Sequence, residues 1–343
     1  MTFPIANGGS TPPIYPAGGS GNSLQATGFI PEIWSGKLIE KFYASTVLAA
    51  ISNTDYEGEI KEHGDRVKIR TKPTINILPY SADGSLSLQR PSGSNVELYI
   101  DKGYYYNTIL DDVMEVQSDL NLLSMWSDDA AEQMKIMIDQ EVLAYIFAQA
   151  DAANQGATAG KISGGINLGT QGAPLTLVNQ NATGGAVEIL DLLLRMGQCL
   201  DEQNIPETGR WVVMPAWAAA MLKNSELRQA YLTGDSVSTL RNGKLGMVDR
   251  FTLYISNLLP TSATSIAVSG GTSETVALSS GQSVFYAGHA HGLTFASQMT
   301  KVETMRSEQT FGTLMRGLQV YGRQVLDGKA LVQSVVLNGG YNN

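Results

Sequence analysis

The chain has 343 residues, a formal net charge of −9 at neutral pH and 43% hydrophobic residues. The acidic excess argues against tight, sequence-independent nucleic-acid binding, which depends on clustered lysine and arginine. A single cysteine excludes an internal disulfide framework, and no stretch approaches the roughly 18 unbroken apolar residues of a membrane span.

The first 31 residues carry no charged side chain and are rich in proline, glycine and serine. Such a segment buries too little apolar surface to offset the entropy cost of its own ordering. Its scattered apolar side chains, among them Phe3, Ile14 and Tyr15, favour an arm that becomes ordered on a partner over a disordered tail. A helical pattern then begins near Ile33 and extends towards Ile51.

Residues 64–102 predict a long two-stranded ribbon. The first strand alternates basic and apolar side chains, so that Val67, Ile69 and Thr71 share one face and the other face carries Arg66, Lys68, Arg70 and Lys72. A tip rich in turn residues separates it from a second alternating strand, 95–101. A lone two-stranded hairpin is marginally stable in water, and its edges invite another chain. The pattern therefore predicts that a neighbour completes part of the fold.

The basic face of this ribbon has two interpretations. A β-ribbon with a basic face can enter a DNA groove. Alternatively, its side chains pair with Glu97 and Asp101 across the hairpin, or with acidic residues of a neighbouring chain. The net negative charge favours pairing.

Residues 111–151 predict a long helix, because apolar residues recur there at intervals of three and four. We expect a break near Ser118 or Ser127. Residues 152–185 are rich in glycine, alanine and asparagine, which indicates a loop or domain boundary.

The second half of the chain predicts a small α/β layer followed by strands. A helix is expected around 186–203, a buried strand at 209–215 and a helix at 216–223. Residues 262–283 predict a surface hairpin, and 284–337 are mostly of strand type.

No catalytic constellation or cofactor motif is evident, so we expect no enzyme, no cofactor and no metal. His289 and His291 could share a face of a strand and ligate a metal, but no third ligand is near in sequence, which favours a polar turn or interface patch. The acidic pairs 111–112, 128–129 and 201–202 indicate solvated helix faces, because adjacent helical residues do not face each other. Cys199 lies at helical spacing from apolar residues and is expected to be buried.

The order of these parts resembles that of the major capsid proteins of tailed double-stranded DNA bacteriophages, which have the Hong Kong 97-type fold. Four phrases carry the resemblance: Gly64–Ile69 at the entry to the extended loop, Gly209–Pro215, Gly246–Pro260 and Tyr321–Val325. Each phrase is weak alone, and their order over nearly the whole chain makes the match.

The resemblance implies an α+β fold with five parts. These would be an N-terminal arm (1–31), a peripheral domain with a spine helix (32–54 and 106–152), an extended β-hairpin loop (55–105), an axial α/β domain (153–285) and C-terminal strands returning through both domains (286–343). It also implies a virion subunit, made in the host cytoplasm, that forms hexamers and pentamers of an icosahedral head around double-stranded DNA. The inter-subunit contacts we expect are Phe3, Ile14, Tyr15, Arg66, Lys68, Arg70, Lys72, Tyr80, Arg90, Glu97 and Asp101.

Two features of this sequence differ from those of some relatives, and they change which partners we expect. The arm begins almost at Met1, so we expect a separate scaffolding protein rather than a fused scaffold, beside a portal protein. No lysine occurs from Pro73 to Asp101, so we expect no covalent cross-link from the ribbon tip. Burial, ribbon pairing or a decoration protein would then stabilise the shell, with DNA bound without sequence specificity and no membrane involved.

Other classes remain as alternatives. An encapsulin, a cellular nanocompartment of the same fold, would differ by a cargo-peptide site on its inner face. A soluble enzyme is disfavoured by the missing catalytic groups, and a tail-tube protein would be shorter and more purely β.

Overall fold

The computed structural model describes residues 43–56, 66–73, 75–80, 87–93, 95–118, 121–225, 246–262, 264–268, 273–308 and 310–340. The chain divides into two units, residues 1–41 and 42–343, and everything described below belongs to the second. The predicted arm, with Phe3, Ile14 and Tyr15, lies outside the described residues, as does the start of the helical pattern at Ile33.

A seven-stranded mixed sheet has the order β5-β4-β14-β11-β6-β8-β7. Its strands are β4 (Leu175–Val178), β5 (Val187–Glu188), β6 (Arg210–Met214), β7 (Met247–Val248), β8 (Phe251–Ile255), β11 (Gln282–His289) and β14 (Leu331–Asn338). Neighbouring residues of β6 point to opposite faces, and all five are buried, so both faces of the sheet are covered.

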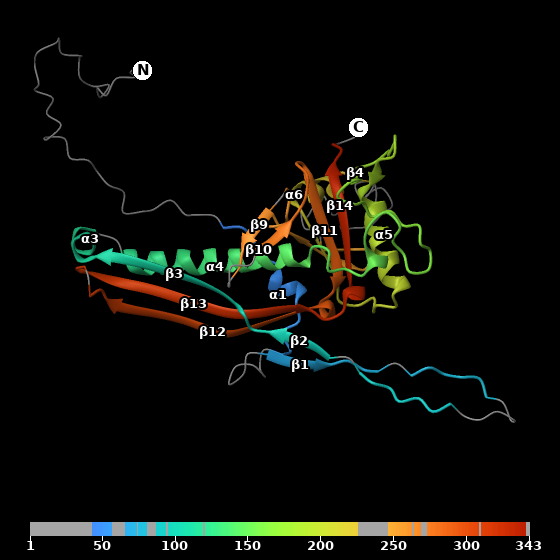
Figure 1. The fold of residues 1–343 in the computed structure, drawn as a ribbon. Helices are drawn as coiled ribbons and strands as arrows, with labels where there is room; N and C mark the ends of the chain where they lie inside the picture. Colours follow the sequence, from blue (N-terminus) through green and yellow to red (C-terminus); the bar gives the residue numbers. More distant parts are fainter. Residues whose placement is uncertain are drawn as a thin grey trace, which may run out of the picture. The chain divides into compact units, whose positions relative to one another are not determined.

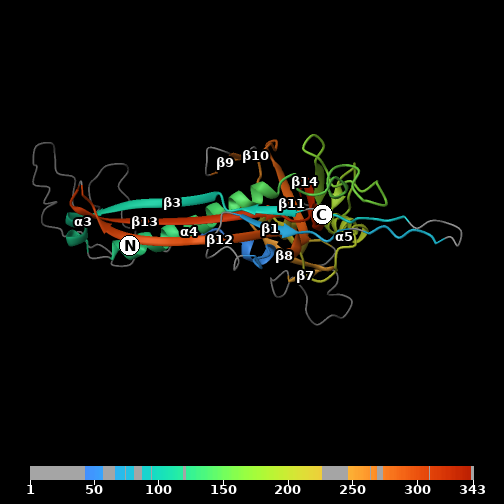
Figure 2. The same cartoon turned by 60° about the horizontal axis from the view of Figure 1, so that its bottom comes forward.

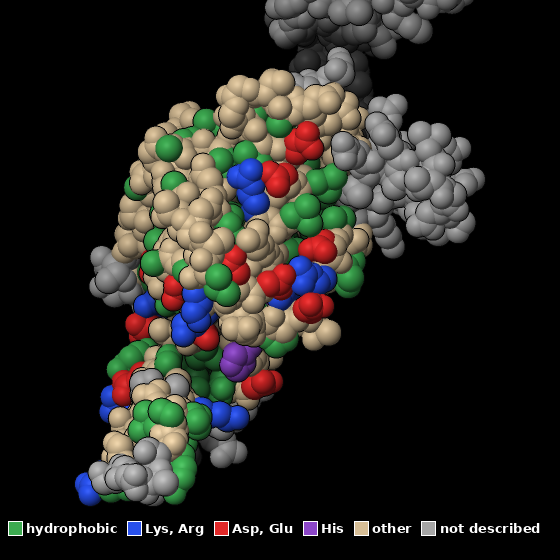
Figure 3. Space-filling model, turned by 90° about the vertical axis from the view of Figure 1, so that its right-hand side faces the viewer, with side chains coloured by type: hydrophobic (Ala, Val, Ile, Leu, Met, Phe, Trp, Pro, Cys, Tyr) green, Lys and Arg blue, Asp and Glu red, His purple; other side chains and the backbone are tan. Residues whose placement is uncertain are grey.

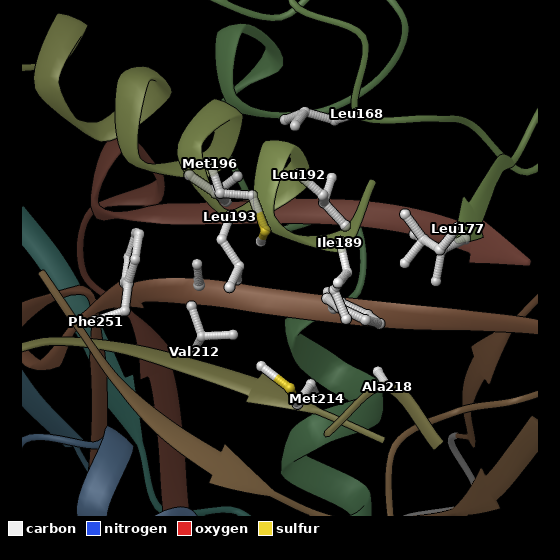
Figure 4. Close-up of a cluster of buried hydrophobic side chains, with 14 of the residues drawn as sticks. Leu168, Leu177, Ile189, Leu192, Leu193, Met196, Val212, Met214, Ala218 and Phe251 are labelled. Carbon is white, nitrogen blue, oxygen red and sulfur yellow. The ribbon is translucent and has the colours of Figure 1, made fainter. Parts of the chain in front are cut away.

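Each face of this sheet has its own hydrophobic core. On one face, Val212 and Met214 pack against α5 (Ile189–Glu202) and α6 (Ala216–Lys223); Figure 4 shows this cluster, to which α5 contributes Ile189, Leu192, Leu193 and Met196. On the other face, Trp211 and Val213 pack with residues of α4 (Leu122–Ile146). The strand and the helix predicted at 209–215 and 216–223 are confirmed, as is the helix around 186–203.

A separate three-stranded antiparallel sheet consists of β3 (Lys102–Asp111), β12 (Leu293–Arg306) and β13 (Gly312–Val325), with β13 in the middle (Figure 2). The helix α4 lies alongside this sheet and contacts β3 and β13 (Figure 1). The short helix α3 (Asp112–Gln117) follows β3 directly. The predicted break of the long helix is confirmed at Ser118, which ends α3, whereas Ser127 lies inside α4.

The smaller elements complete the described chain. The predicted surface hairpin is confirmed as β9 (Thr264–Ala267) and β10 (Ser273–Val276), which packs against α4. Single 3-10 turns occur at Ala152–Asn154, Ala290–Gly292 and Gly328–Ala330. Within the described ranges, no helix combines the length and the apolar character needed to cross a bilayer.

Of the helical pattern expected up to Ile51, the described residues from 43 onward form only α1 (Leu48–Ile51), and residues 43–47 are not helical. In this segment, hydrogen bonds to distant parts of the chain take the place of helical backbone hydrogen bonds. The backbone N–H groups of Val47 and Leu48 donate to Asp139 on α4, and Asn53 forms a parallel bridge to Thr294 in β12.

The ribbon has a paired base, in which β1 (Arg66–Arg70) pairs antiparallel with β2 (Asn95–Tyr99). Its apolar face, with Val67 and Ile69, packs with Leu98 against Ala296 of β12 and Val320 of β13. The chain itself therefore supplies the surface that the base of the ribbon needs, so the support expected from a neighbour concerns the part of the ribbon beyond its base.

Replacing Gly322 with alanine is expected to lower the free energy of unfolding by about 1–3 kcal/mol, the usual cost of overpacking. A Cβ atom at Gly322 of β13 would lie 2.2 Å from the carbonyl oxygen of Tyr99, at the ribbon base. Gly172→Ala is the matched control, since a Cβ there meets nothing within 4 Å. Urea denaturation measures both variants, and equal stabilities would contradict the close approach of ribbon and sheet.

Candidate assembly surfaces

The outward face of the ribbon base carries the predicted basic side chains and one acidic partner. Arg66, Lys68 and Arg70 are exposed on β1. The carboxylate of Glu97 lies 3.6 Å from the Arg66 guanidinium and 3.3 Å from the Lys68 ammonium. A hydrogen bond from the Tyr99 hydroxyl, together with Lys68, lowers the pKa of Glu97. The expected pairing with Glu97 is confirmed, whereas the pairing expected for Asp101 is wrong, because its carboxylate lies 2.8 Å from Lys102.

Beyond its base the ribbon has no described strand, and most of its described side chains are exposed. The outgoing and returning segments of the ribbon are joined by two hydrogen bonds between Asn76 and Gln89, of 3.0 and 2.7 Å. Ile77 is 91% exposed, Leu88 83% and Tyr80 81%, and the predicted contacts Lys72 and Arg90 are exposed as well. Contiguous exposed apolar side chains on a soluble chain mark an interaction surface or an aggregation liability. We call described residues 71–93 the distal ribbon.

A second apolar surface lies where β3, β12 and β13 reach α3. Its exposed side chains are Ile109, Val113, Met114, Val116, Met305 and Phe311. A bidentate ion pair between Arg306 and Asp112, with both distances 2.7 Å, joins the end of β12 to the start of α3. Asp112 thus has a defined partner, which corrects the expectation of a merely solvated acidic pair. Nearby, a groove of about 520 Å³ is lined by residues including Tyr105, Leu318 and Arg316.

A buried charge network joins α4, β13 and the β9–β10 hairpin. Arg323 of β13 forms a bidentate hydrogen-bonded ion pair with Glu141 of α4, and both side chains are at most 2% exposed. The Tyr321 hydroxyl donates to Glu141 at 3.1 Å, and the Arg323 guanidinium lies 3.7 Å from the centre of the Tyr145 ring. Glu274 of β10 accepts a further hydrogen bond from Arg323 at 2.8 Å. Burial opposes the charge of Arg323, but Glu141 and Glu274 outweigh it and raise the pKa of Arg323.

A second ionic cluster ties α5 to β6 and to the turn between β7 and β8. The Asp201 carboxylate accepts from Arg210, whose side chain is fully buried, and from Arg250, both at 2.7 Å. Burial alone would raise the pKa of Asp201, but the two arginines lower it. The adjacent Glu202 accepts from the backbone N–H groups of Ile162 and Ser163, which with other hydrogen bonds lowers the pKa of Glu202 to about 2. The pair 201–202 therefore organises the fold rather than only facing solvent, which corrects the sequence-based interpretation.

The remaining candidate groups do not converge on a chemical site. His289 ends β11 and His291 lies in the following 3-10 turn, where the backbone N–H of His291 donates to His289 Nδ1. Among the residues that the structure describes, no three histidine, cysteine or acidic side chains are grouped as metal ligands. Cys199 is buried as predicted, and burial raises the pKa of its thiol to about 12, which leaves it unreactive. On the face shown in Figure 3, basic and acidic side chains lie interspersed.

Comparison with known proteins shows which family has this fold. A family model described as phage capsid protein matches residues 106–334, which is most of the chain. The chain belongs to this phage capsid protein family. A search of curated proteins found no match.

Solved capsid structures share the fold. A structure from Mycobacterium phage Che8 is 26% identical, covers 89% of this chain and 97% of its own, and has a TM-score of 0.67. The capsid of cyanophage P-SCSP1u is 15% identical with a TM-score of 0.69, covering 91% and 94%. The mature capsid of bacteriophage PhiM1 is 14% identical with a TM-score of 0.63, covering 92% of each chain.

The protein is therefore a structural subunit of a virion shell, a major capsid protein with the Hong Kong 97-type fold, as the resemblance implied. These relatives do not favour the encapsulin alternative. The family is a structural, non-enzymatic one, and its members self-associate into shells.

Proposed function

We propose that the subunit assembles as hexamers and pentamers into an icosahedral head that encloses double-stranded DNA. The observation that carries this proposal is the distal ribbon, whose apolar side chains find no cover within the described part of their own chain. A lattice of copies gives each such segment a neighbour to lie on. Many modest contacts per subunit then make the closed shell stable by multivalency.

Within this proposal the parts of the chain take distinct roles. Residues 1–31 would be the arm, 55–105 the extended loop over the next subunit, and 32–54 with 106–152 the peripheral domain around α4. Residues 153–285 would form the axial domain near the five- and six-fold centres, and 286–343 would return through both domains. The seven-stranded sheet with α5 and α6 supports the axial assignment, and the alignment of α4 with the three-stranded sheet supports the peripheral one.

The proposed inter-subunit contacts combine the exposed ribbon with the arm. On the ribbon they are the exposed Arg66, Lys68, Arg70, Lys72, Tyr80 and Arg90. Glu97 and Asp101 would contribute indirectly. Each already pairs with a basic side chain of its own chain, and an acidic surface of a neighbouring subunit would compete with it for that side chain. In the arm the proposed contacts are Phe3, Ile14 and Tyr15.

Further partners are part of the same proposal. A separate scaffolding protein and a portal protein would take part in assembly in the host cytoplasm, and a decoration protein is a further candidate partner. The net charge of −9 supports a shell that encloses DNA without binding it tightly, because acidic side chains repel the phosphates. We expect no recognition of DNA sequence. We assign the chain no enzymatic activity.

Electron microscopy of the purified full-length protein tests the proposal. Closed icosahedral particles with six- and five-fold clusters are expected. Tubes of uniform width would support a tail-tube protein instead, and particles that co-purify with an enclosed enzyme would support an encapsulin. A protein that stays monomeric at every concentration and with every crowding agent would contradict the proposal.

Deleting residues 1–31 is expected to leave a folded subunit that assembles poorly, because this uncharged segment has too few apolar residues to form a core of its own. Circular dichroism and thermal denaturation check the fold, and particle yield by sedimentation checks assembly. Normal shells from the truncated chain would refute the role of the arm.

A further inference from the structure

The buried carboxylate of Asp139 accepts hydrogen bonds from the backbone of residues 47 and 48, which are far from it in the sequence. It lies on α4, and the residue is 1% exposed. Its carboxylate accepts a hydrogen bond of 2.9 Å from the backbone N–H of Leu48 and one of 3.2 Å from that of Val47. Both donors belong to the segment 43–56, which connects the arm to the ribbon along the chain.

No described cation balances the charge of Asp139. A cavity of about 280 Å³ lies beside it, and its other lining residues are Thr46, Leu48, Ala49, Ser52, Thr54, Lys135, Ile138, Phe295 and Gln319. Of these only Lys135 is charged, and its ammonium lies on the exposed side of α4, 2.6 Å from the Glu132 carboxylate. The residues that β12 and β13 contribute, Phe295 and Gln319, are uncharged. Burial accordingly raises the pKa of Asp139 to about 6, although the two backbone hydrogen bonds act in the opposite direction.

The same segment has a second attachment that involves no ionisable group. The backbone N–H of Asn53 donates to Leu293 at 2.8 Å, and the N–H of Phe295 donates back to Asn53 at 3.0 Å. The segment is thus held on α4 by the buried Asp139 carboxylate and by an exposed hydrogen bond of 2.8 Å from the Tyr43 hydroxyl to Asp129, and near its other end by backbone pairing with β12.

We propose that Asp139 is a proton-dependent clasp, which holds segment 43–56 on α4 most tightly when its carboxyl group is protonated and loosens the segment when it ionises. The cavity offers hydroxyl groups of Thr46, Ser52 and Thr54 and the amide of Gln319 as neighbours for a carboxyl proton. At neutral pH the ionised form remains buried without a countercharge, which is a cost that release of the segment relieves. This property belongs to the folded subunit and does not depend on the form of the shell.

The direction of the effect follows from linkage. In the clasped state burial raises the carboxyl pKa to about 6, and exposure of the group to solvent on release would return the pKa towards its ordinary value of 3.8. The clasped state therefore binds the proton more strongly, and raising the pH through 6 favours release. Between pH 5.0 and 7.5, full exposure of the carboxyl group on release gives about a tenfold change in the clasping equilibrium.

Hydrogen exchange of the full-length chain at pH 5.0 and 7.5 tests the clasp, with rates corrected for intrinsic exchange and equal oligomeric state checked by sedimentation. After correction, the amides of Val47 and Leu48 are expected to exchange about tenfold faster at pH 7.5. The amide of Phe295 serves as an internal reference and is expected to change much less.

Asp139→Asn, which has no ionisable carboxyl group, is expected to abolish the pH dependence at Val47 and Leu48, whereas Glu132→Gln keeps it. The proposal is overturned if the wild-type amides show no corrected pH dependence, or if D139N retains it. Should D139N fail to fold, the wild-type contrast between the Leu48 and Phe295 amides decides: a pH effect at Leu48 alone supports the clasp, and an equal effect at both contradicts it.

Discussion

Replacing Glu141 with glutamine is expected to lower the free energy of unfolding by about 3–5 kcal/mol, the cost of removing one partner of a buried ion pair. The variant keeps the shape of the side chain but leaves the Arg323 guanidinium, 2% exposed, with Glu274 as its remaining carboxylate partner in the described network. Chemical denaturation of the unassembled subunit measures the loss.

Glu274→Gln is the matched control for this prediction. It removes the other carboxylate from the same guanidinium, but Glu274 is 32% exposed and sits on the hairpin β9–β10. We expect a loss of about 1 kcal/mol, since a partly solvated pair contributes little. A double variant, Glu141→Leu with Arg323→Met, is expected to recover much of the stability, because an apolar pair of similar volume removes both buried charges. Equal losses in E141Q and E274Q would show that the network does not anchor α4 to β13.

Replacing Ile77 and Leu88 together with aspartate is expected to abolish shell formation while changing the stability of the isolated subunit by less than about 0.5 kcal/mol. Both side chains are more than four-fifths exposed, so the subunit does not use them for its own core. A neighbour that buries them would have to desolvate two carboxylates, and every copy in the lattice would carry that cost.

Ser87→Asp supplies the control for the ribbon variant, because it adds a charge next to Leu88 at an exposed position without removing an apolar side chain. Thermal denaturation compares the subunits, and sedimentation with electron microscopy compares particle yields. If the doubly substituted chain forms normal shells, the distal ribbon is not an assembly surface.

The sequence predicted local structure well wherever one periodicity dominated. The run Arg210–Met214 is apolar on both faces after its first residue and ends at a proline, so a buried strand was the natural interpretation. The alternation in 66–70 correctly separated the charged face of the ribbon from its apolar face. The break predicted near Ser118 coincides with the end of α3.

The misses arise from contacts between residues far apart in the chain. Glu141 and Asp139 occur in a helix with many exposed polar residues, and nothing local shows that β13 and segment 43–56 bury them. A retrospective signal exists for Glu141, which lies three residues after Ile138 and three before Ala144 and so shares a helix face with core positions. The support of the ribbon base by Ala296 and Val320 depends on a separation of some two hundred residues, which periodicity does not encode.

The central claim is that neighbouring copies of the chain cover the segments that it leaves exposed. The distal ribbon tests this claim most directly. Hydrogen exchange of residues 75–80 and 87–93 should be compared between isolated subunits and assembled shells at one pH. We expect these amides to exchange rapidly in the subunit and to be strongly protected in the shell. Equal, strong protection in a well-behaved monomer would contradict the account, because the ribbon would then need no neighbour.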